Sequence, residues 1–274
     1  MDAAALVDLE RYPIDRLDSA EGQALLARTR ADLDGKALAL LPGFLRQGAI
    51  DAMVAEAEPL EAGAHRRERE RTSYGWMDNR GFPEGHPRRA LHTLRGGSIT
   101  RDMIAPGGPT ARLYEWPPLV DFVRRALGHE TLYPCADPWL ALEFHIEDQG
   151  DRFGWHYDTN DGVVSLLLRA PDEGGAFEYV PFIRDEDDEN YDEVARVFAG
   201  TSSLVQRPPM APGTFILFRG RRSIHRVSAV GATRKPRLIA LLSYDRNPGM
   251  VFPEATVRAV LNSSNEPHLG SHPT

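Results

Sequence analysis

The stretch Phe153-Gly154-Trp155-His156-Tyr157-Asp158 decides how this chain is interpreted. His156 and Asp158 are two positions apart, and on an extended strand side chains at that spacing point to the same face. One metal ion could therefore take both as ligands. A second histidine, His225, lies much further along in Ser223-Ile224-His225-Arg226-Val227. A strand returning from that distance would complete a set of two imidazoles and one carboxylate.

Such a set occupies one side of an ion and leaves the opposite coordination positions open. It is the facial triad of non-heme Fe(II) oxygenases, whose open positions receive a co-substrate and O2. Two other interpretations stay open at this point. The H-x-D pattern arises easily by chance, and a strand histidine is often only a packed or solvated residue. A zinc hydrolase would use the same three ligands.

Composition places the chain among ordinary globular proteins. Of its 274 residues, 42% are hydrophobic and 26% are charged, so we expect a single domain over residues 1–274. The net charge of −8 and the lack of a long basic stripe argue against nucleic acid as a partner. The short basic run from Arg66 to Arg71 is interrupted by acids, and we interpret it as a solvated helix face or a mobile loop rather than a phosphate site.

The sequence carries no sign of secretion or of a membrane partner. Cys135 is the single cysteine, which excludes an internal disulfide and a Cys-based zinc cluster. The first residues have an acid where the basic region of a signal peptide belongs, and no apolar run approaches membrane-spanning length. We therefore expect a cytoplasmic protein.

Residues 1–140 read as a helical and irregular N-terminal part. Apolar residues recur at helical spacing over about 19–32, 47–60 and 117–127, with Gly128 as the expected stop of the third helix, and 36–41 reads as a short buried strand. Between 61 and 108 the periodicity fails. A loop of that length inside a compact domain is usually functional or disordered, so we interpret it as a candidate substrate lid.

From residue 141 the texture changes to short strands bounded by Gly, Pro or Asp. The predicted strands cover 141–147, 153–158, 163–169, 176–180, 203–206, 214–219, 224–230 and 238–244. Such a series predicts an α+β protein whose core, residues 141–250, is a double-stranded β-helix (jelly roll, cupin-like) with the N-terminal helices packed on the sheet. Residues 251–274 are left as a C-terminal tail.

The motifs of this β half, taken in order, resemble the Fe(II)- and 2-oxoglutarate-dependent oxygenases. Within them the sequence is most similar to the group of free-amino-acid radical halogenases and their hydroxylase relatives. The resemblance covers roughly residues 38–250. The motifs that carry it are Gly154–Asp158, Pro171–Pro181, Pro212–Phe218, His225–Val227 and Arg237–Asp245.

The resemblance implies a metal site and its co-substrates. His156, Asp158 and His225 would be the ligands of Fe(II), with 2-oxoglutarate and O2 as co-substrates and no further catalytic side chain. Arg237, with Arg234 as its competitor, would bind the distal carboxylate of 2-oxoglutarate, since a guanidinium fits a carboxylate bidentately. In the halogenases a small residue, usually glycine, replaces the iron carboxylate and vacates a position for chloride. Asp158 is present here, so we expect hydroxylation.

The implied reaction inserts oxygen into an unactivated C–H bond of a small polar metabolite, with a free amino acid favoured, and releases succinate and CO2. Glu143 is the candidate partner of an ammonium group, Thr159 and Asn160 are candidate polar contacts, and Arg95 is a candidate partner of a carboxylate. Two alternatives remain. One is the same oxidative chemistry giving desaturation or cyclisation of a natural-product intermediate, and the other is a non-catalytic jelly roll that binds a metal or a small acid.

Overall fold

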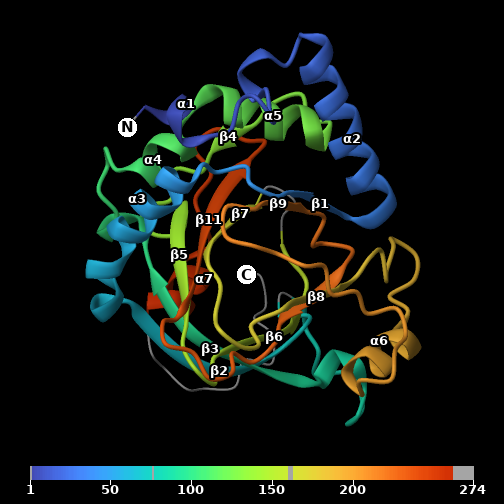
Figure 1. Ribbon diagram of the computed structural model, residues 1–274. Coiled ribbons are helices and arrows are strands. Elements are labelled where there is room, and N and C mark those ends of the chain that lie inside the picture. Colours follow the sequence, from blue (N-terminus) through green and yellow to red (C-terminus); the bar gives the residue numbers. More distant parts are fainter. Residues whose placement is uncertain (1, 76, 160–162, 262–274) are drawn as a thin grey trace.

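An antiparallel sheet that curls round on itself organises the structure, a computed structural model that describes residues 2–75, 77–159 and 163–261 (Figure 1). Among these residues the sheet has eleven strands. They are β1 Leu38–Leu41, β2 His65–Thr72, β3 Leu91–Ile99, β4 Tyr133–Pro134, β5 Leu142–Glu147, β6 Arg152–His156, β7 Val163–Arg169, β8 Phe177–Val180, β9 Phe215–Phe218, β10 Ile224–Val227 and β11 Arg237–Asp245.

The strand order is β1-β9-β7-β11-β5-β3-β6-β10-β8, with β2 on the free edge of β3 and β4 beside β11. Strands next to each other are far apart in the chain, as in the pair β5 and β11, which is the pattern of a jelly roll. β3 joins the two halves, because its residues pair with β5 at one end and with β6 further back. The predicted α+β double-stranded β-helix is thereby confirmed.

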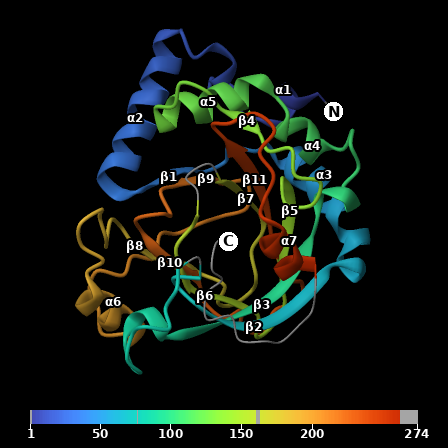
Figure 2. The same cartoon turned by 180° about the vertical axis from the view of Figure 1, so that it is seen from behind.

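Helices α1 to α5 gather along one side of the roll, while α6 lies near the opposite side and α7 lies beside β5 (Figures 1 and 2). Their bounds are α1 Ala3–Leu6, α2 Ala20–Lys36, α3 Gln47–Ala57, α4 Pro109–Tyr114, α5 Pro117–Leu127, α6 Tyr191–Phe198 and α7 Glu254–Leu261. Local sequence sets the ends of α2 and α5. The Ser19 hydroxyl accepts from Gly22 N at the start of α2, and Gly128 ends α5 with φ of 75°, as expected.

The two faces of the sheet bury different residues. Alternate residues of β11, such as Leu238 and Ala240, belong to the large core between the sheet and α1 to α5. The residues between them, Ile239 and Leu241, pack instead with Phe218 in a smaller cluster that lines the inside of the roll. Side chains on the second face therefore define the interior, and any ligand site inside the roll must be built from them.

A bulge in β6 turns an extra residue into this interior. β10 pairs His225 with His156 but Val227 with Phe153, so three residues of β6 span the distance of two on its partner. Phe153 and His156 consequently share the inner face, where their rings lie 4.4 Å apart. Gly154 inside the bulge approaches β3 closely, because a Cβ there would come within 2.6 Å of His92 Cβ.

The prediction that residues 61–108 form an irregular loop, interpreted as a candidate substrate lid, is wrong. β2 and β3 lie within it and pair along their full length, from His65 opposite Ser98 to Thr72 opposite Leu91. Arg, Glu, His and Gly dominate these strands, and none of them gives the apolar alternation that marks a strand. The basic run is likewise strand β2 rather than a helix face or a mobile loop.

Two smaller expectations also change. Residues 203–206 contribute a single bridge, between Gln206 and Tyr179, rather than a strand. The tail beyond residue 250 begins with helix α7, whose Val257 and Val260 pack on Leu140. Among the helices of the described residues, none combines the length and the apolarity needed to cross a membrane.

Phe215 tests the core between the sheet and the helices. It is fully buried, and its ring centroid lies 4.8 Å from that of Phe44 and 5.7 Å from that of Phe122. We expect Phe215→Ala to lower the free energy of unfolding by about 3–5 kcal/mol, because it leaves a cavity. Urea denaturation measures this, with Leu204→Ala, at a side chain 51% exposed, as the control. Equal effects of the two substitutions would contradict the assigned core.

Candidate metal centre

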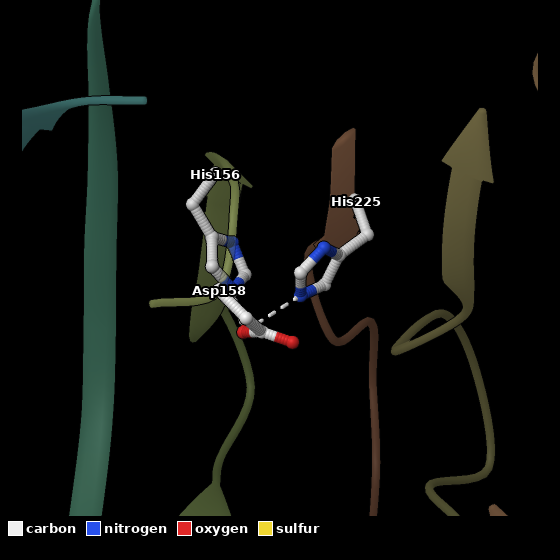
Figure 3. A group of neighbouring side chains, drawn as sticks. All are labelled: His156, Asp158 and His225. Carbon is white, nitrogen blue, oxygen red and sulfur yellow. Dashed lines mark ion pairs between the residues drawn. The ribbon is translucent and has the colours of Figure 1, made fainter. Parts of the chain in front are cut away.

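The register of β6 and β10 brings two histidines together inside the roll. His225 is paired directly with His156, and their ring centroids lie 4.0 Å apart. Asp158 follows β6 and turns its carboxylate toward both rings (Figure 3). Asp158 Oδ1 lies 3.4 Å from His225 Nε2 and 3.9 Å from His156 Nε2. The structure thus assembles the triad expected from the sequence.

Backbone carbonyls fix which ring nitrogen of each histidine faces the centre. His156 Nδ1 lies 2.9 Å from Gly154 O, and His225 Nδ1 lies 3.1 Å from Ser223 O. A carbonyl oxygen can only accept, so both Nδ1 atoms carry a proton and both Nε2 lone pairs face Asp158. Burial and the neighbouring His225 hold the pKa of His156 well below its usual range, which keeps this imidazole neutral.

Gly220 makes room for the Asp158 carboxylate. Asp158 N donates to Gly220 O at 3.2 Å, which brings the two backbones together. A Cβ at position 220 would overlap Asp158 Oδ2. No signal in the sequence points to this role, because position 220 is close to position 158 only in the folded chain.

These three side chains fit a divalent metal ion. One ligand atom from each lies within 4.8 Å of the others. Neutral imidazoles with Nδ1–H bonded to carbonyls are the form in which histidine binds metals, and one carboxylate completes the facial triad. The donor set is that of non-heme Fe(II).

Arg237 also points into the roll, as expected, but it has a partner that the sequence did not predict. It shares the inner face of β11 with Ile239, is only 4% exposed, and donates from Nη1 to Glu147 Oε2 of the paired strand β5. A guanidinium has five N–H donors, so the bond to Glu147 leaves others for a ligand. Arg234, its competitor, is 89% exposed and pairs with Asp172.

The substrate candidates from the sequence separate into two groups. Glu143 lies on the inner face of β5, 8% exposed, and its Oε1 accepts no hydrogen bond. Thr159 is exposed beside Asp158, and Asn160 lies outside the described residues. Arg95 is not brought to the site, because it lies on the outer face of β3 and pairs with Asp151 at 3.0 Å.

Sequence reasoning missed two groups that share the interior. His145 lies beside Glu143, with Nε2 3.7 Å from Glu143 Oε1. Arg67, Arg69 and Arg71 occupy alternate positions of β2. Their spacing of two was the available signal, but the acids between them, on the other face, made the run look like a solvated helix.

Solved structures share this fold at low sequence identity. The epimerase SnoN from nogalamycin biosynthesis, described as non-heme and α-ketoglutarate dependent, is 18% identical over 81% of each chain, with a TM-score of 0.56. The carbocyclase SnoK is 14% identical over 88% of this chain and 94% of its own, with a TM-score of 0.54. EctD from S. alaskensis, solved with 2-oxoglutarate and 5-hydroxyectoine, is 20% identical over 89% and 86%, with a TM-score of 0.52.

A jelly roll of this topology with two histidines and an aspartate converging inside it defines the Fe(II)- and 2-oxoglutarate-dependent oxygenases, and the chain is of that class. The resemblance seen in the motifs is thereby confirmed. More narrowly, residues 21–250 match the Halogenase D family, so the chain belongs to that family. No curated protein matches the sequence.

Gly220 offers a test of the metal centre that leaves every ligand in place. We expect Gly220→Ala to weaken Mn(II) binding by about 10–100-fold, the usual effect of disturbing a ligand's support, because the new Cβ displaces the Asp158 carboxylate. Titration followed by Mn(II) EPR measures the affinity. Gly35→Ala is the matched control, since no atom lies within 4 Å of a Cβ there. Unchanged affinity in Gly220→Ala would mean that Asp158 does not bind the metal.

Proposed function

We propose that the protein is an Fe(II)- and 2-oxoglutarate-dependent hydroxylase of a free amino acid or a similarly small polar metabolite. The observation that carries the choice of hydroxylation is Asp158. Its carboxylate faces both histidine Nε2 atoms, so it takes the place that a halide would need. Three protein ligands and a chelating keto acid leave room for O2 but none for a halide in a six-coordinate site.

In this proposal His156, Asp158 and His225 hold the metal. The iron, with 2-oxoglutarate and O2, supplies the oxidation of an unactivated C–H bond, with succinate and CO2 as co-products. The chain's own contribution is positional. The carbonyls of Gly154 and Ser223 fix the two rings, and Phe218 packs 4.8 Å from the His225 ring and shields it from water. We assign no proton transfer to a side chain.

Arg237 is proposed to bind the distal carboxylate of 2-oxoglutarate. It is buried, points into the roll on the metal side of the sheet, and keeps donors beyond the one used by Glu147. Glu147 fixes the guanidinium and matches its charge. The exposed ion pair of Arg234 with Asp172 gives it no such position.

Glu143 is proposed to bind the ammonium group of the substrate. A buried carboxylate oxygen without a hydrogen bond is costly, so a donor from the ligand fits this position. The His145 ring lies next to it, with Nε2 3.7 Å from Glu143 Oε1. The competing outcome is another oxidation, since structures of this fold include an epimerase and a carbocyclase. Product mass separates these outcomes.

The proposed reaction is tested by adding Fe(II) and 2-oxoglutarate without O2, and then O2 with a panel of amino acids. We expect a visible charge-transfer band, a shift of that band with the substrate, and succinate in step with a product heavier by one oxygen. Asp158→Gly should lose at least about 100-fold of this turnover, because one of three metal ligands is removed. Full hydroxylase turnover in Asp158→Gly, or a chlorinated product from the unchanged protein, would refute the proposal.

The assignment of Arg237 has a separate test. We expect Arg237→Lys to raise the KM for 2-oxoglutarate by about tenfold or more, because a lysine keeps the charge opposite Glu147 but loses the bidentate fork. Arg234→Lys is the matched control and should leave that KM unchanged. Thermal melting of both variants reports any loss of stability. A larger effect at position 234 would reverse the assignment.

A further inference from the structure

Strand β2 carries a row of three arginines on the face that lines the interior of the roll. Arg67 is paired with Gly96, and a Cβ built on Gly96 would lie 3.7 Å from Glu147 Cγ. Arg67 Nη1 also donates to Ser98 Oγ at 2.9 Å, and Ser98 is paired with His145 on β5. Arg69 and Arg71 follow at spacings of two, so their side chains leave the strand on the same side.

The row has few partners within the chain. Arg67 is 9% exposed, and its Nε makes no hydrogen bond. Arg69 donates from Nη1 to Ala259 O of α7 at 3.2 Å, and its Nε also lacks a partner. Arg71 lies over the Phe153 ring, 4.9 Å from its centroid, and makes no hydrogen bond or ion pair within the described residues.

The other face of the same strand behaves differently. Arg66 pairs with Asp148 and Asp151, and Glu70 accepts from Thr93 Oγ1 at 2.6 Å. On the outer face of β2, Arg66 and Glu68 thus have charged partners and Glu70 has a hydrogen bond, while the inner face has no ion pair among the described residues. Burial and mutual repulsion lower the pKa of Arg67 to about 10 and of Arg71 to about 9. A guanidinium nevertheless keeps its proton near neutral pH, so these positive charges remain. Glu143 acts on Arg67 and Asp158 acts on Arg71, but none of the three arginines forms an ion pair among the described residues.

The row leads to the metal centre at one end and to Glu143 at the other. Arg71 stacks on Phe153, whose ring lies 4.4 Å from the His156 ring. Arg67 feels the negative charge of Glu143, which raises its pKa against the effect of burial. A small molecule between Glu143 and the metal would therefore lie along the arginines.

Counting charges shows what such a molecule must bring. On the inner faces of β2, β5 and residues 237–241 of β11, four guanidinium groups stand against two carboxylates, Glu143 and Glu147. Iron, 2-oxoglutarate and Asp158 together add one net negative charge. One positive charge remains, and a zwitterionic amino acid without a charged side chain would not balance it.

We propose that the arginines of β2 select an amino acid that carries a second anionic group, a carboxylate or a phosphate, on its side chain. This inference rests on the proposed function for the amino-acid part. Glu143 takes the ammonium group, and the row takes the two anionic groups by charge-assisted hydrogen bonds. With the ammonium group at Glu143 and the two anionic groups along the arginines, a carbon of the chain that joins these groups would face the metal.

The test uses pairs of ligands of which one member carries the second anionic group and the other does not; the acid and amide pairs also match in shape. Calorimetric titration of the protein loaded with Mn(II) and 2-oxoglutarate compares glutamate with glutamine, aspartate with asparagine, and O-phosphoserine with serine. We expect at least one acid to bind about tenfold or more tightly than its neutral partner, equivalent to about 1.4 kcal/mol. The carboxylate and phosphate pairs show which anionic group the row takes. Higher salt should reduce the preference.

Variants then show whether β2 is the cause. Arg71→Gln should bring the ratio of acid to amide affinity close to one, while Arg66→Gln, the same change on the outer face of the same strand, should leave it intact. Three results would overturn the proposal: equal or tighter binding of the neutral partners, no binding of any acid, or a loss of 2-oxoglutarate binding in Arg71→Gln with the ratio unchanged. Tight acid binding without succinate formation would instead refute the hydroxylase and leave this inference standing.

Discussion

The antiparallel pairing of β6 with β10 is the constraint on which the site depends. Residues paired directly in such a ladder point to the same face, so the register places the His225 ring beside His156. A slip of either strand by one residue would turn its histidine out of the roll. The bulge in β6 then adds Phe153 to the same face, and Asp158 follows at the end of the strand. The metal centre is therefore a product of sheet register and not of a local loop.

Charge inside the roll is the second constraint, because a buried ion without a partner is expensive. The two candidate ligand histidines have their Nδ1 atoms beside backbone carbonyls, and the buried Arg237 guanidinium pairs with Glu147. The inner arginines of β2 form no ion pair among the described residues. The acids of the same strand, which could pair with them, face outward. Because the paired outer charges and the inner arginines without ion pairs lie on the same strand, the composition of β2 does not explain why only one face has ion pairs. In our proposal, an anionic ligand would supply the counter-charge that the inner face needs beyond Glu143 and Asp158.

How much the sequence could predict follows from where each signal lies. Apolar periodicity found β7 and α5 with their full bounds, because both bury apolar residues and are bounded by turn or cap residues. The spacing of His156 and Asp158 is local, so these two candidate metal ligands could be found as well. β2 could not, since charges on both its faces hide the alternation of a strand. Nor could the pair Arg237 and Glu147, whose contact depends on the register of strands 90 residues apart.

The family to which the chain belongs is named for halogenation, and residue 158 argues against that reaction here. The carboxylate at this position is supported by a second position, since Gly220 has no side chain where a Cβ would meet Asp158 Oδ2, and its carbonyl accepts from Asp158 N. A chain with a small residue at 158 would have no need to keep that space clear. Two positions that meet only in the folded protein therefore agree on a carboxylate beside the histidines, which is why we propose hydroxylation and not halide transfer for this member of the family.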